Sequence, residues 1–454
     1  MEQERTEAII QYLQEKKYGK ARLELLTQNE VDIAELLEEV IEELGMEKAL
    51  VLFRILPKDV SVDVFSYLPA EEQVEIINRI TDKEINHIME ELAFDDMIDV
   101  LEELPANVVD KILEQTPKEE RRLINTFLNY PETSAGSLMT IDYISLRKDM
   151  TVAQALAYIK KVGMDQETIY TCYVKDNGRK LLGIVSLRSL VISDETAIVE
   201  DVMHEDGMIY VNAMDDREEV ANIFKKYNFM ALPVVDNEIR LVGIITFDDI
   251  MDVIDEEVTE DFQRMAGVAA SGEEYLDMSV WQHFKSRIPW LFFLMLSYVV
   301  TGSIITSFEA VLSQVISLVA YMPMLMGTGG NSGSQSATLI IRGMAVGDVE
   351  LPDAGKVLWK ELRVSLLIGI CLSVLNFGRI YYLEKQPLMI ALTVCLAMLV
   401  IVMAAKTIGS LLPMGAKKVG IDPAIMASPM ISSLTDMVSV ITYFAMATLF
   451  LGIG

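Results

Sequence analysis

The sequence predicts a multidomain membrane protein with four parts. These are an all-α superhelical N-terminal domain, an α/β domain built from two copies of one unit, a connecting helix, and an α-helical transmembrane domain of five helices. Three observations predict this fold: helical periodicity over residues 1–130, a tandem strand-and-helix repeat over 138–258, and long apolar stretches after residue 287. The expected domain boundaries are 1–130, 131–255, 256–286 and 287–454.

The N-terminal domain is predicted to consist of helices. Apolar residues recur at helical spacing in AIIQYLQEKKYGKARLELL and in DIAELLEEVIEELG. Residues 53–80 and 89–117 then repeat one pattern, in which a short helix is followed by a Leu-Pro pair and a second helix. Proline is tolerated at a helix start because the first turn does not use its missing donor. The predicted helix starts are Leu56-Pro57, Leu68-Pro69 and Leu104-Pro105. Repeated helical hairpins stack into a superhelix.

Residues 138–258 contain two copies of the order strand, helix, strand, turn, strand, helix. Asn177-Gly178 in the first copy and residues 236–238 in the second supply the turn between adjacent strands. This order and the closing strands GIVS and GIIT resemble a tandem CBS (Bateman) pair. In such pairs a Thr and an Asp often hold the ribose of an adenosine ligand. The resemblance therefore makes ATP a candidate ligand at Thr246 and Asp249.

Charge is divided unevenly along the chain. From Lys285 onward there are 11 Lys and Arg against 8 Asp and Glu, or +3, whereas the whole chain carries −30, so residues 1–284 carry −33. This acidic region argues against nucleic acid, which binds to basic surfaces, and is compatible with a cation-rich partner. The 3 cysteines are too few and too scattered for a disulfide framework or a zinc site, which indicates a reducing, cytosolic side.

The C-terminal part contains the predicted membrane spans, at residues 288–308, 311–327 with a polar continuation, 363–383, 388–412 and 424–452. Each is long enough for a hydrocarbon core about 30 Å thick at about 1.5 Å per residue. Lys and Arg are concentrated before span one, between spans two and three, and between spans four and five. By the positive-inside rule the N-terminal domains are cytoplasmic and the C-terminus is outside. We expect a multi-pass protein of the plasma (inner) membrane.

Asp436 is a carboxylate well inside the last span. An ionisable group is costly in hydrocarbon, so it usually faces a cavity and marks an ion or proton path. Helical spacing places Ser428, Ser432 and Thr435 on the same face, and Asp422 about 21 Å away at the cytoplasmic mouth. Oxygen ligands without Cys or His favour Mg²⁺, which keeps several waters and needs one or two carboxylates. Na⁺ and H⁺ stay open as alternatives.

Two motifs, PMLMGTGGNSGSQSATLIIRG in span two and DPAIMASP…TDMVSVITYF in span five, resemble the pore signatures of the MgtE family of magnesium channels and transporters. The order of helical domain, CBS pair, connecting (plug) helix and five spans is also that of this family. The resemblance implies Mg²⁺-selective uptake through a homodimer with one pore on its two-fold axis. It further implies hydrated Mg²⁺ held near Asp436, with Gly329, Gly330 and Asn331 beside the same path.

The resemblance also implies that cytosolic Mg²⁺ closes the pore by binding between acidic cytoplasmic domains. Like charges that face each other repel, and divalent ions relieve this repulsion and favour a compact state. The matching positions are Asp216, Glu218, Asp249, Asp252, Glu257, Glu260, Asp261 and Asp422, with Asp95, Asp96 and Asp99 as candidates in the N-terminal domain.

Two other functions stay open at this point. The chain could transport another divalent cation, Co²⁺ or Mn²⁺, or it could be a membrane-anchored CBS nucleotide sensor. The pore motifs argue against the sensor, because an anchor needs neither Asp436 nor a stretch rich in glycine and amides. The sequence contains no nucleophile–base pair and no phosphate loop, so we do not expect an enzyme.

Overall fold

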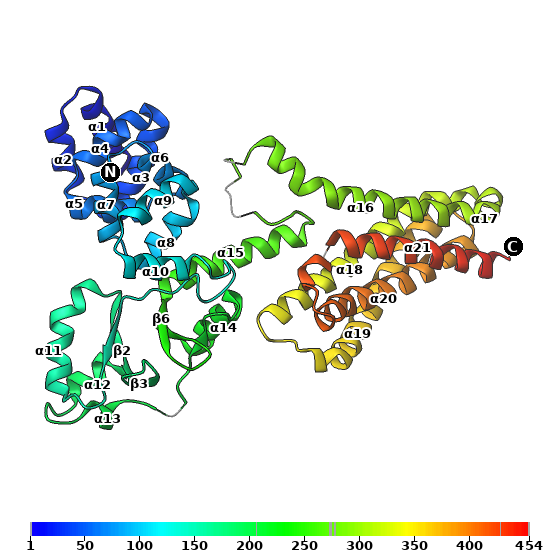
Figure 1. Ribbon diagram of the computed structural model, residues 1–454. Coiled ribbons are helices and arrows are strands. Elements are labelled where there is room, and N and C mark those ends of the chain that lie inside the picture. The colour runs from blue at the N-terminus through cyan, green and yellow to red at the C-terminus, as the bar shows by residue number, and fades with distance from the viewer. Residues whose placement is uncertain (1, 206, 272–274, 277, 427, 453–454) are drawn as a thin grey trace. The chain divides into compact units, whose positions relative to one another are not determined.

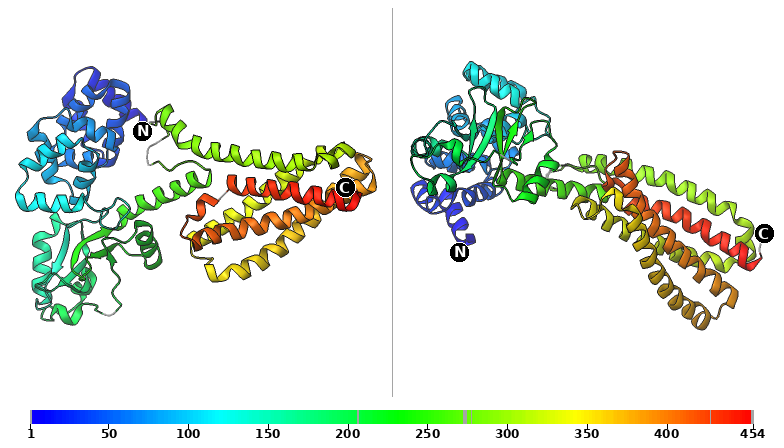
Figure 2. Two further views of the ribbon diagram at one scale, coloured as in Figure 1. Left: turned by 45° about the vertical axis from the view of Figure 1, so that its right-hand side comes forward. Right: turned by 90° about the horizontal axis from the view of Figure 1, so that it is seen from below.

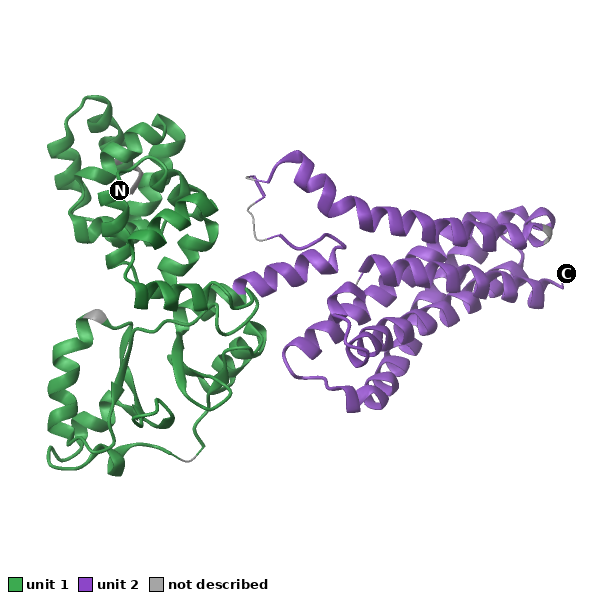
Figure 3. Cartoon of the chain, in the orientation of Figure 1, with its two compact units in different colours: residues 1–254 green, residues 255–454 purple. Residues whose placement is uncertain are grey.

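Figure 1 shows a computed structural model of the chain, which describes residues 2–205, 207–271, 275–276, 278–426 and 428–452. The chain divides into two compact units, residues 1–254 and 255–454, which we call unit 1 and unit 2 (Figure 3).

Unit 1 begins with short helices that pack around one apolar core. They are α1 (Glu2–Gln14), α2 (Tyr18–Leu25), α3 (Glu30–Leu44), α4 (Met46–Ile55), α5 (Lys58–Ser66), α6 (Ala70–Ile77), α7 (Asp82–Glu91), α8 (Phe94–Glu103), α9 (Ala106–Gln115) and α10 (Lys118–Phe127). Residues at the periodic apolar positions, such as Leu37, Leu52 and Phe65, are fully buried. The predicted Leu-Pro helix starts are confirmed, because α5, α6 and α9 each begin one residue after the proline.

The rest of unit 1 contains two three-stranded sheets with the same topology. The first copy comprises β1 (Tyr143–Leu146), α11 (Val152–Val162), β2 (Thr168–Lys175), β3 (Leu181–Ser186) and α12 (Leu187–Ile192), and α13 (Val199–Val202) follows it. The second copy comprises β4 (Val211–Asn212), α14 (Arg217–Tyr227), β5 (Ala231–Val235), β6 (Leu241–Thr246) and α15 (Phe247–Met265). In each sheet the first two strands are parallel and the last two are antiparallel.

The two copies are interlocked by exchanged backbone pairs. Thr140, which precedes β1, exchanges two hydrogen bonds of 2.8 and 2.9 Å with Ile244 of β6 in the other copy. His204, which precedes β4, does the same with Ile184 of β3, at 2.8 and 3.1 Å. Each sheet is therefore completed by the segment that leads into the other copy.

A glycine in each closing strand makes room for this exchange. A Cβ atom at Gly243 would lie 2.8 Å from the carbonyl oxygen of Thr140, and a Cβ at Gly183 would lie 3.0 Å from that of His204. Both obstacles are backbone atoms, which cannot rotate away as a side chain can. Close backbone packing therefore explains why both GIVS and GIIT begin with glycine.

Unit 2 consists mainly of long helices, which run alongside one another in both views of Figure 2. Among the described residues, four helical segments are long and apolar enough to cross a membrane: Val280–Ser307, Leu351–Leu383, Leu388–Lys418 and Pro423–Leu451. They contain α16 (Val280–Ser307), α19 (Ala354–Gly378, continued by a π-helix over Arg379–Leu383), α20 (Leu388–Lys418) and α21 (Ser428–Leu451). A further helix, α18 (Met322–Ala345), is more polar, but its 24 residues reach about 36 Å.

The connecting helix predicted over 256–286, with Gly267 and residues 270–272 as candidate interruptions, differs from the structure in its start. Helix α15 starts at Phe247, directly after β6, and ends at Met265, and the next helix starts only at Val280. Gly267 has a φ of 73°, a left-handed conformation that stops a helix and that glycine adopts without strain.

The second span also differs from its prediction over 311–327. A short helix α17 (Glu309–Gln314) and a 3₁₀ turn (Ile316–Tyr321) come first, and the long helix begins at Met322. The glycine- and amide-rich stretch, which the sequence places in span two as its polar continuation, is the middle of α18.

The exchanged strand pairs predict a test of the interlocked fold. Gly243→Ala should destabilise unit 1 by roughly 1–3 kcal/mol, the usual cost of overpacking a rigid site. Thermal unfolding of residues 1–254 measures this change. The matched control is Gly19→Ala in α2, where a Cβ meets nothing within 4 Å and should be neutral or mildly stabilising. Equal stability of the Gly243 variant and the control would contradict the packing argument.

Candidate functional site

Small residues of α18 form its contact with α20 and α21. A Cβ at Gly329 would lie 2.6 Å from Oγ of Ser439 on α21, and one at Gly333 would lie 3.1 Å from the carbonyl oxygen of Ala405 on α20. The carbonyl of Gly333 also lies directly against Gly409 of α20. Helices in a membrane approach this closely only where side chains are small. The glycines therefore bring three backbones together within the bundle.

A polar face lies beside this contact, partly on α18 and partly on α21. On α18, Asn331 and Gln335 are exposed. On α21, Ser428 is exposed and Ser432 is partly exposed. A 3.1 Å hydrogen bond from the Ser428 hydroxyl to that of Ser334 joins the two helices. The polar residues of the two motifs therefore meet on one side of unit 2.

The predicted pore-lining residues divide into two groups in the structure. Gly329, Gly330 and Thr435 are buried in the contact between helices, and the Thr435 hydroxyl donates to the carbonyl of Ser432 at 3.0 Å. Asn331, Ser428 and Ser432 retain exposed surface. The second group can present oxygen atoms to water, whereas the first group positions the helices that carry it.

Asp436 lies on α21 one turn beyond Ser432 and is partly buried. Within the part of the chain that the structure describes, its carboxylate has neither a hydrogen-bond donor nor a cationic partner. A carboxylate without a partner in a membrane span requires water or a cation. Asp436 is therefore the strongest candidate for an ion ligand among the span helices.

At one end of unit 2, Asp422 is bound by an arginine that sequence analysis did not identify. Arg264 of α15 forms ion pairs with both Asp422 and Glu260. The other oxygen of Asp422 accepts from the backbone N–H of Ala424 at 2.8 Å. Burial, then the charges of Asp422 and Glu257, raise the pKa of Asp261, and Arg342 partly offsets this. The predicted carboxylates do gather here, but with arginine counter-charges.

A second gathering of carboxylates lies within unit 1 and joins its helical domain to both CBS copies. Asp95 and Asp96 come from the first turn of α8, Asp248 and Asp249 from the first turn of α15, and Glu167 from the segment before β2. Their charges act on one another. We call these five residues the acidic cluster. Sequence analysis missed Asp248 and Glu167, and only the adjacency of Asp248 to Asp249 gave a signal.

Burial and mutual repulsion raise the pKa values of the carboxylates in the acidic cluster. Burial, then the charges of Asp249 and Asp96, raise the pKa of Asp95 to about 8. Burial, then Asp249 and Asp248, raise the pKa of Asp96 to about 6. Glu167 keeps exposed surface, yet loss of surrounding water and then Asp248 and Asp249 raise its pKa to about 7. Burial also raises the pKa of Asp249. The cluster therefore resists full ionisation near neutral pH.

One atom of the cluster fits a cation directly. Oδ1 of Asp95 is buried and, in the described part of the structure, has no hydrogen-bond partner. No group of three or more His, Cys, Asp or Glu residues among the described residues is arranged closely enough to hold a metal ion as it stands. The cluster thus has the charge and the free oxygen for a cation, whereas its side chains would have to move to bind one.

The other predicted carboxylates of unit 1 occupy different positions. Asp252 adjoins the cluster, since its charge raises the pKa of Asp249. Asp99 is exposed on α8. Asp216 caps α14 by accepting the backbone N–H of Glu218 at 2.9 Å, and both of these residues are exposed.

Thr246 and Asp249, the candidate ATP contacts, lie at the junction of β6 and α15. The Thr246 hydroxyl donates to Oδ2 of Asp249 at 2.5 Å, and the backbone N–H of Thr246 donates to the same oxygen at 3.3 Å. Thr246 is buried and Asp249 is partly buried. The two residues are thus adjacent in space, as a shared ribose contact requires, but the carboxylate also belongs to the acidic cluster.

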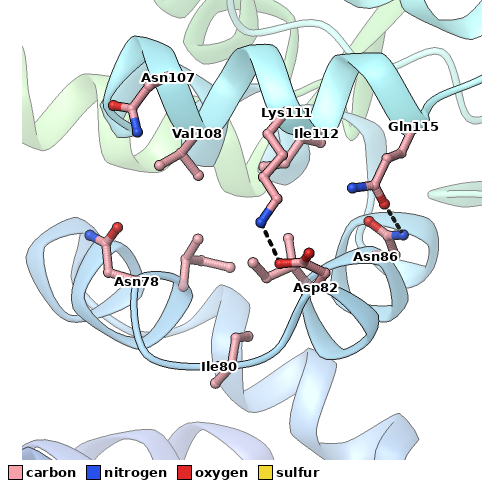
Figure 4. Close-up of a pocket in the computed structure, with 11 residues that line it drawn as sticks. Asn78, Ile80, Asp82, Asn86, Asn107, Val108, Lys111, Ile112 and Gln115 are labelled. Carbon is pink, nitrogen blue, oxygen red and sulfur yellow. Dashed lines mark hydrogen bonds and ion pairs between the residues drawn. The ribbon is translucent and has the colours of Figure 1, made fainter.

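A separate pocket of about 190 Å³ lies in the helical domain between α7 and α9 (Figure 4). Asn86 donates to Gln115 across it at 2.6 Å, and Lys111 pairs with Asp82. The described residues that line it include none of the predicted metal ligands. It is therefore unrelated to the acidic cluster.

Three family models match the chain over most of its length. The MgtE divalent cation transporter model matches residues 322–446, the MgtE intracellular N domain matches 28–133, and the CBS domain matches 135–193 and 199–256. The transporter model covers both pore-like motifs, and the CBS matches cover both interlocked copies.

Known proteins agree with these models. The chain is 39% identical over 331 residues to the magnesium transporter MgtE of Thermus thermophilus, which is 73% of each chain. It is 33% identical over 333 residues to that of Enterococcus faecalis, covering 73% of this chain and 72% of the other. The chain is also similar to a crystal structure of the cytosolic domain of the Mg²⁺ channel MgtE in complex with ATP. That match has 34% identity and a TM-score of 0.51, and it covers 55% of this chain and 99% of the other. By its motifs, its domains and these relatives, the chain belongs to the MgtE transporter family.

Proposed function

We propose that the protein transports Mg²⁺ across the membrane, and that Asp436 is the residue on which selection of the ion depends. The observation that carries this proposal is a carboxylate without a partner in the described part of a membrane helix, beside a face of hydroxyl and amide groups. The relatives named as magnesium transporters and as a Mg²⁺ channel support the choice of ion.

The chemistry of this face suits a hydrated ion. Mg²⁺ gives up its water reluctantly and is usually bound through one or two carboxylates. Asp436 supplies the negative charge, and Asn331, Ser428 and Ser432 supply neutral oxygen atoms that can contact the water shell. Co²⁺ and Mn²⁺ remain candidates for the same site, whereas a nucleotide sensor would have no use for it.

The polar face also supports a homodimer. Exposed amides and a carboxylate at membrane depth cannot face lipid, because their polar groups would be left unsatisfied. A second copy placed against this face would cover it and enclose a water-filled path on the two-fold axis. The basic residues next to the spans support cytoplasmic N-terminal domains and an outside C-terminus in the plasma (inner) membrane.

Cytosolic Mg²⁺ would regulate this path through the carboxylates of both units. The carboxylates of the acidic cluster repel one another when ionised, and a divalent ion bound between them would relieve this repulsion. A second group of carboxylates in unit 2 would respond in the same way: Glu257, Glu260, Asp261 and Asp422. When no ion is bound, Arg264 would form its ion pair with Asp422. Low cytosolic Mg²⁺ would let the carboxylates separate and release the connecting helix.

ATP would be a second regulatory ligand at Thr246 and Asp249. The relative crystallised with ATP supports this, as does the adjacency of the two side chains. Because Asp249 also belongs to the acidic cluster, ATP and a bridging cation would compete for one carboxylate.

Asp436→Ala should abolish Mg²⁺ uptake into reconstituted liposomes, because no other carboxylate is available at that point of α21. The protein should still fold, as judged by its size-exclusion profile. The matched control is Asp348→Ala, which removes an exposed carboxylate between α18 and α19 and should leave uptake unchanged. Normal flux in the Asp436 variant would refute the pore assignment. Uptake of Co²⁺ or Mn²⁺ without Mg²⁺ would favour the alternative cations.

Neutralising Asp249, Asp252 and Glu257 together should leave currents insensitive to Mg²⁺ on the cytosolic side. The repulsion that Mg²⁺ relieves would then be largely absent. Patch recording with Mg²⁺ titrated on the cytosolic face measures both conduction and inhibition. The control neutralises three exposed acids of the helical domain, Asp110, Glu114 and Glu119, and should keep inhibition. Undiminished inhibition in the first variant would show that sensing lies elsewhere.

The raised pKa of Asp95 predicts how stability depends on pH without divalent ions. Its pKa is about 8 in the folded unit against about 3.9 when unfolded. The folded state therefore binds more protons, and stability falls as pH rises from about 4 to about 8. Asp95→Asn should stabilise residues 1–254 at pH 8 and have little effect at pH 4.

Thermal unfolding in the presence of a chelator, at both pH values, measures this difference. Asp110→Asn on α9 is the control and should give similar changes at both. A destabilising or pH-independent effect of Asp95→Asn would contradict the electrostatic account of the cluster.

A further inference from the structure

Three polar residues meet in the interior of the span helices, away from Asp436 and the acidic carboxylates. Ser336 of α18 donates to Oε2 of Glu361 on α19 at 2.6 Å. Lys406 of α20 donates to the Ser336 hydroxyl at 3.1 Å, and its Nζ lies 3.8 Å from the same Glu361 oxygen. We call these three residues the clamp. Each comes from a different helix, so the clamp ties α18, α19 and α20 together at one point.

The clamp is deeply buried. Ser336 is fully buried, Lys406 is 4% exposed, and the Glu361 side chain is 14% exposed. Removing a lysine and a glutamate from water costs several kcal/mol each, and their attraction often only offsets that cost. Apolar residues of similar volume would pack these helices at least as well. A gain in stability therefore does not explain the ion pair at this place. Its hydrogen bonds do differ from apolar packing in one respect, because they form only at particular orientations of the helices.

The glycine contact between α18 and α20 lacks that directionality. One turn away from Ser336, Gly333 meets Gly409 backbone to backbone. A contact between glycines presents a smooth surface, which lets one helix rotate or slide on the other. The clamp lies on the same side of α18 as Gly333, since positions three residues apart share a face. It adds hydrogen bonds that form only at one rotation of the helix.

The rotation of α18 decides what its other faces present. At 3.6 residues per turn, neighbouring residues point about 100° apart. Gln335 precedes Ser336, and Asn331 lies one turn before Gln335, so holding Ser336 toward Glu361 and Lys406 turns both amides to the exposed face. Gly330 faces Ser432 of α21. A Cβ atom added at Gly330 would lie 3.5 Å from the Cβ of Ser432.

We propose that Ser336, Glu361 and Lys406 are positioning residues that set the rotation of α18 and thereby turn Asn331 and Gln335 to its exposed face, next to the positions that contact Ser432 and Ser428 of α21. The role of this placement in ion selection rests on the proposed function, but the rotation itself does not. A test therefore has one measurement that is independent of transport and one that depends on it.

The first measurement is a disulfide between cysteines at positions 330 and 432. The Cβ separation of 3.5 Å at Gly330 and Ser432 is within the range that a disulfide accepts. Gly330→Cys and Ser432→Cys are combined in a background where Cys172, Cys371 and Cys395 are replaced by Ala. Oxidation of the full-length protein in detergent is followed by a gel shift after thiol labelling.

Two clamp variants are compared in this background. Ser336→Ala removes the bridging hydroxyl, and the double variant Lys406→Met with Glu361→Gln removes both charges without leaving one buried and unpaired. Each should slow disulfide formation about tenfold, the shift in population expected when a charge-assisted hydrogen bond is lost. Ser410→Ala is the control. This buried serine of α20 donates within its own helix, to the Thr407 carbonyl at 3.1 Å, and its replacement should not change the rate.

The second measurement is the ratio of Mg²⁺ to Co²⁺ uptake by liposomes that contain each clamp variant with native residues at 330 and 432. The ratio should fall in both variants and stay unchanged in Ser410→Ala. Unchanged cross-linking in correctly folded clamp variants would overturn the proposal. Misfolding of both variants would also overturn it, because the clamp would then serve folding rather than rotation. If Asp436→Ala transports normally, the proposed function fails while the cross-linking result still decides the rotation.

Discussion

An ionised carboxylate inside a membrane protein must be satisfied by water, a donor or a cation, and in unit 2 this requirement applies to Asp436. The helix that carries it, α21, meets the middle of α18 at Gly329, Gly330 and Gly333, where Ser432 and Ser439 of α21 lie against the glycines. This close approach leaves a face of amides and hydroxyls beside the carboxylate. Because such a face is incompatible with lipid, the same requirement favours a second copy of the chain and a path for water between the copies.

The same physics operates in unit 1 with a different outcome. There the carboxylates come from three separate segments, the start of α8, the residue before β2, and the start of α15. They are close enough to raise one another's pKa but are not arranged as a finished metal site. Carboxylates that repel one another without a cation, and that must move to bind one, are suited to sensing the cation concentration. In the proposed function, Asp436 selects the ion that passes, and the acidic cluster responds to the ion that has accumulated.

Much of the architecture could be predicted because it depends on local patterns. The Leu-Pro helix starts, the repeated strand and helix order, and the apolar spans are set by spacing along the chain. The predictions failed where the local pattern was ambiguous. The start of the connecting helix was placed too late, since acidic helical periodicity alone does not mark where β6 ends and α15 begins, whereas the interruption at Gly267 agrees with the end of α15 at Met265. Span two was predicted to begin at residue 311, whereas its long helix begins at Met322, because hydropathy does not show where one apolar helix ends and the next begins.

Local patterns along the chain are enough to give the family resemblance, the acidic and apolar halves, and the presence of Asp436 within the last span. Which charges meet depends on how distant segments come together in the fold. Arg264 with Asp422, Glu167 with Asp248 and Asp249, and Ser336 with Glu361 and Lys406 are pairs or groups from distant segments. The local sequence around Lys406 does not show that this lysine is buried against Ser336 and Glu361. Electrostatic partners are chosen by proximity in space, and proximity is a property of the folded chain.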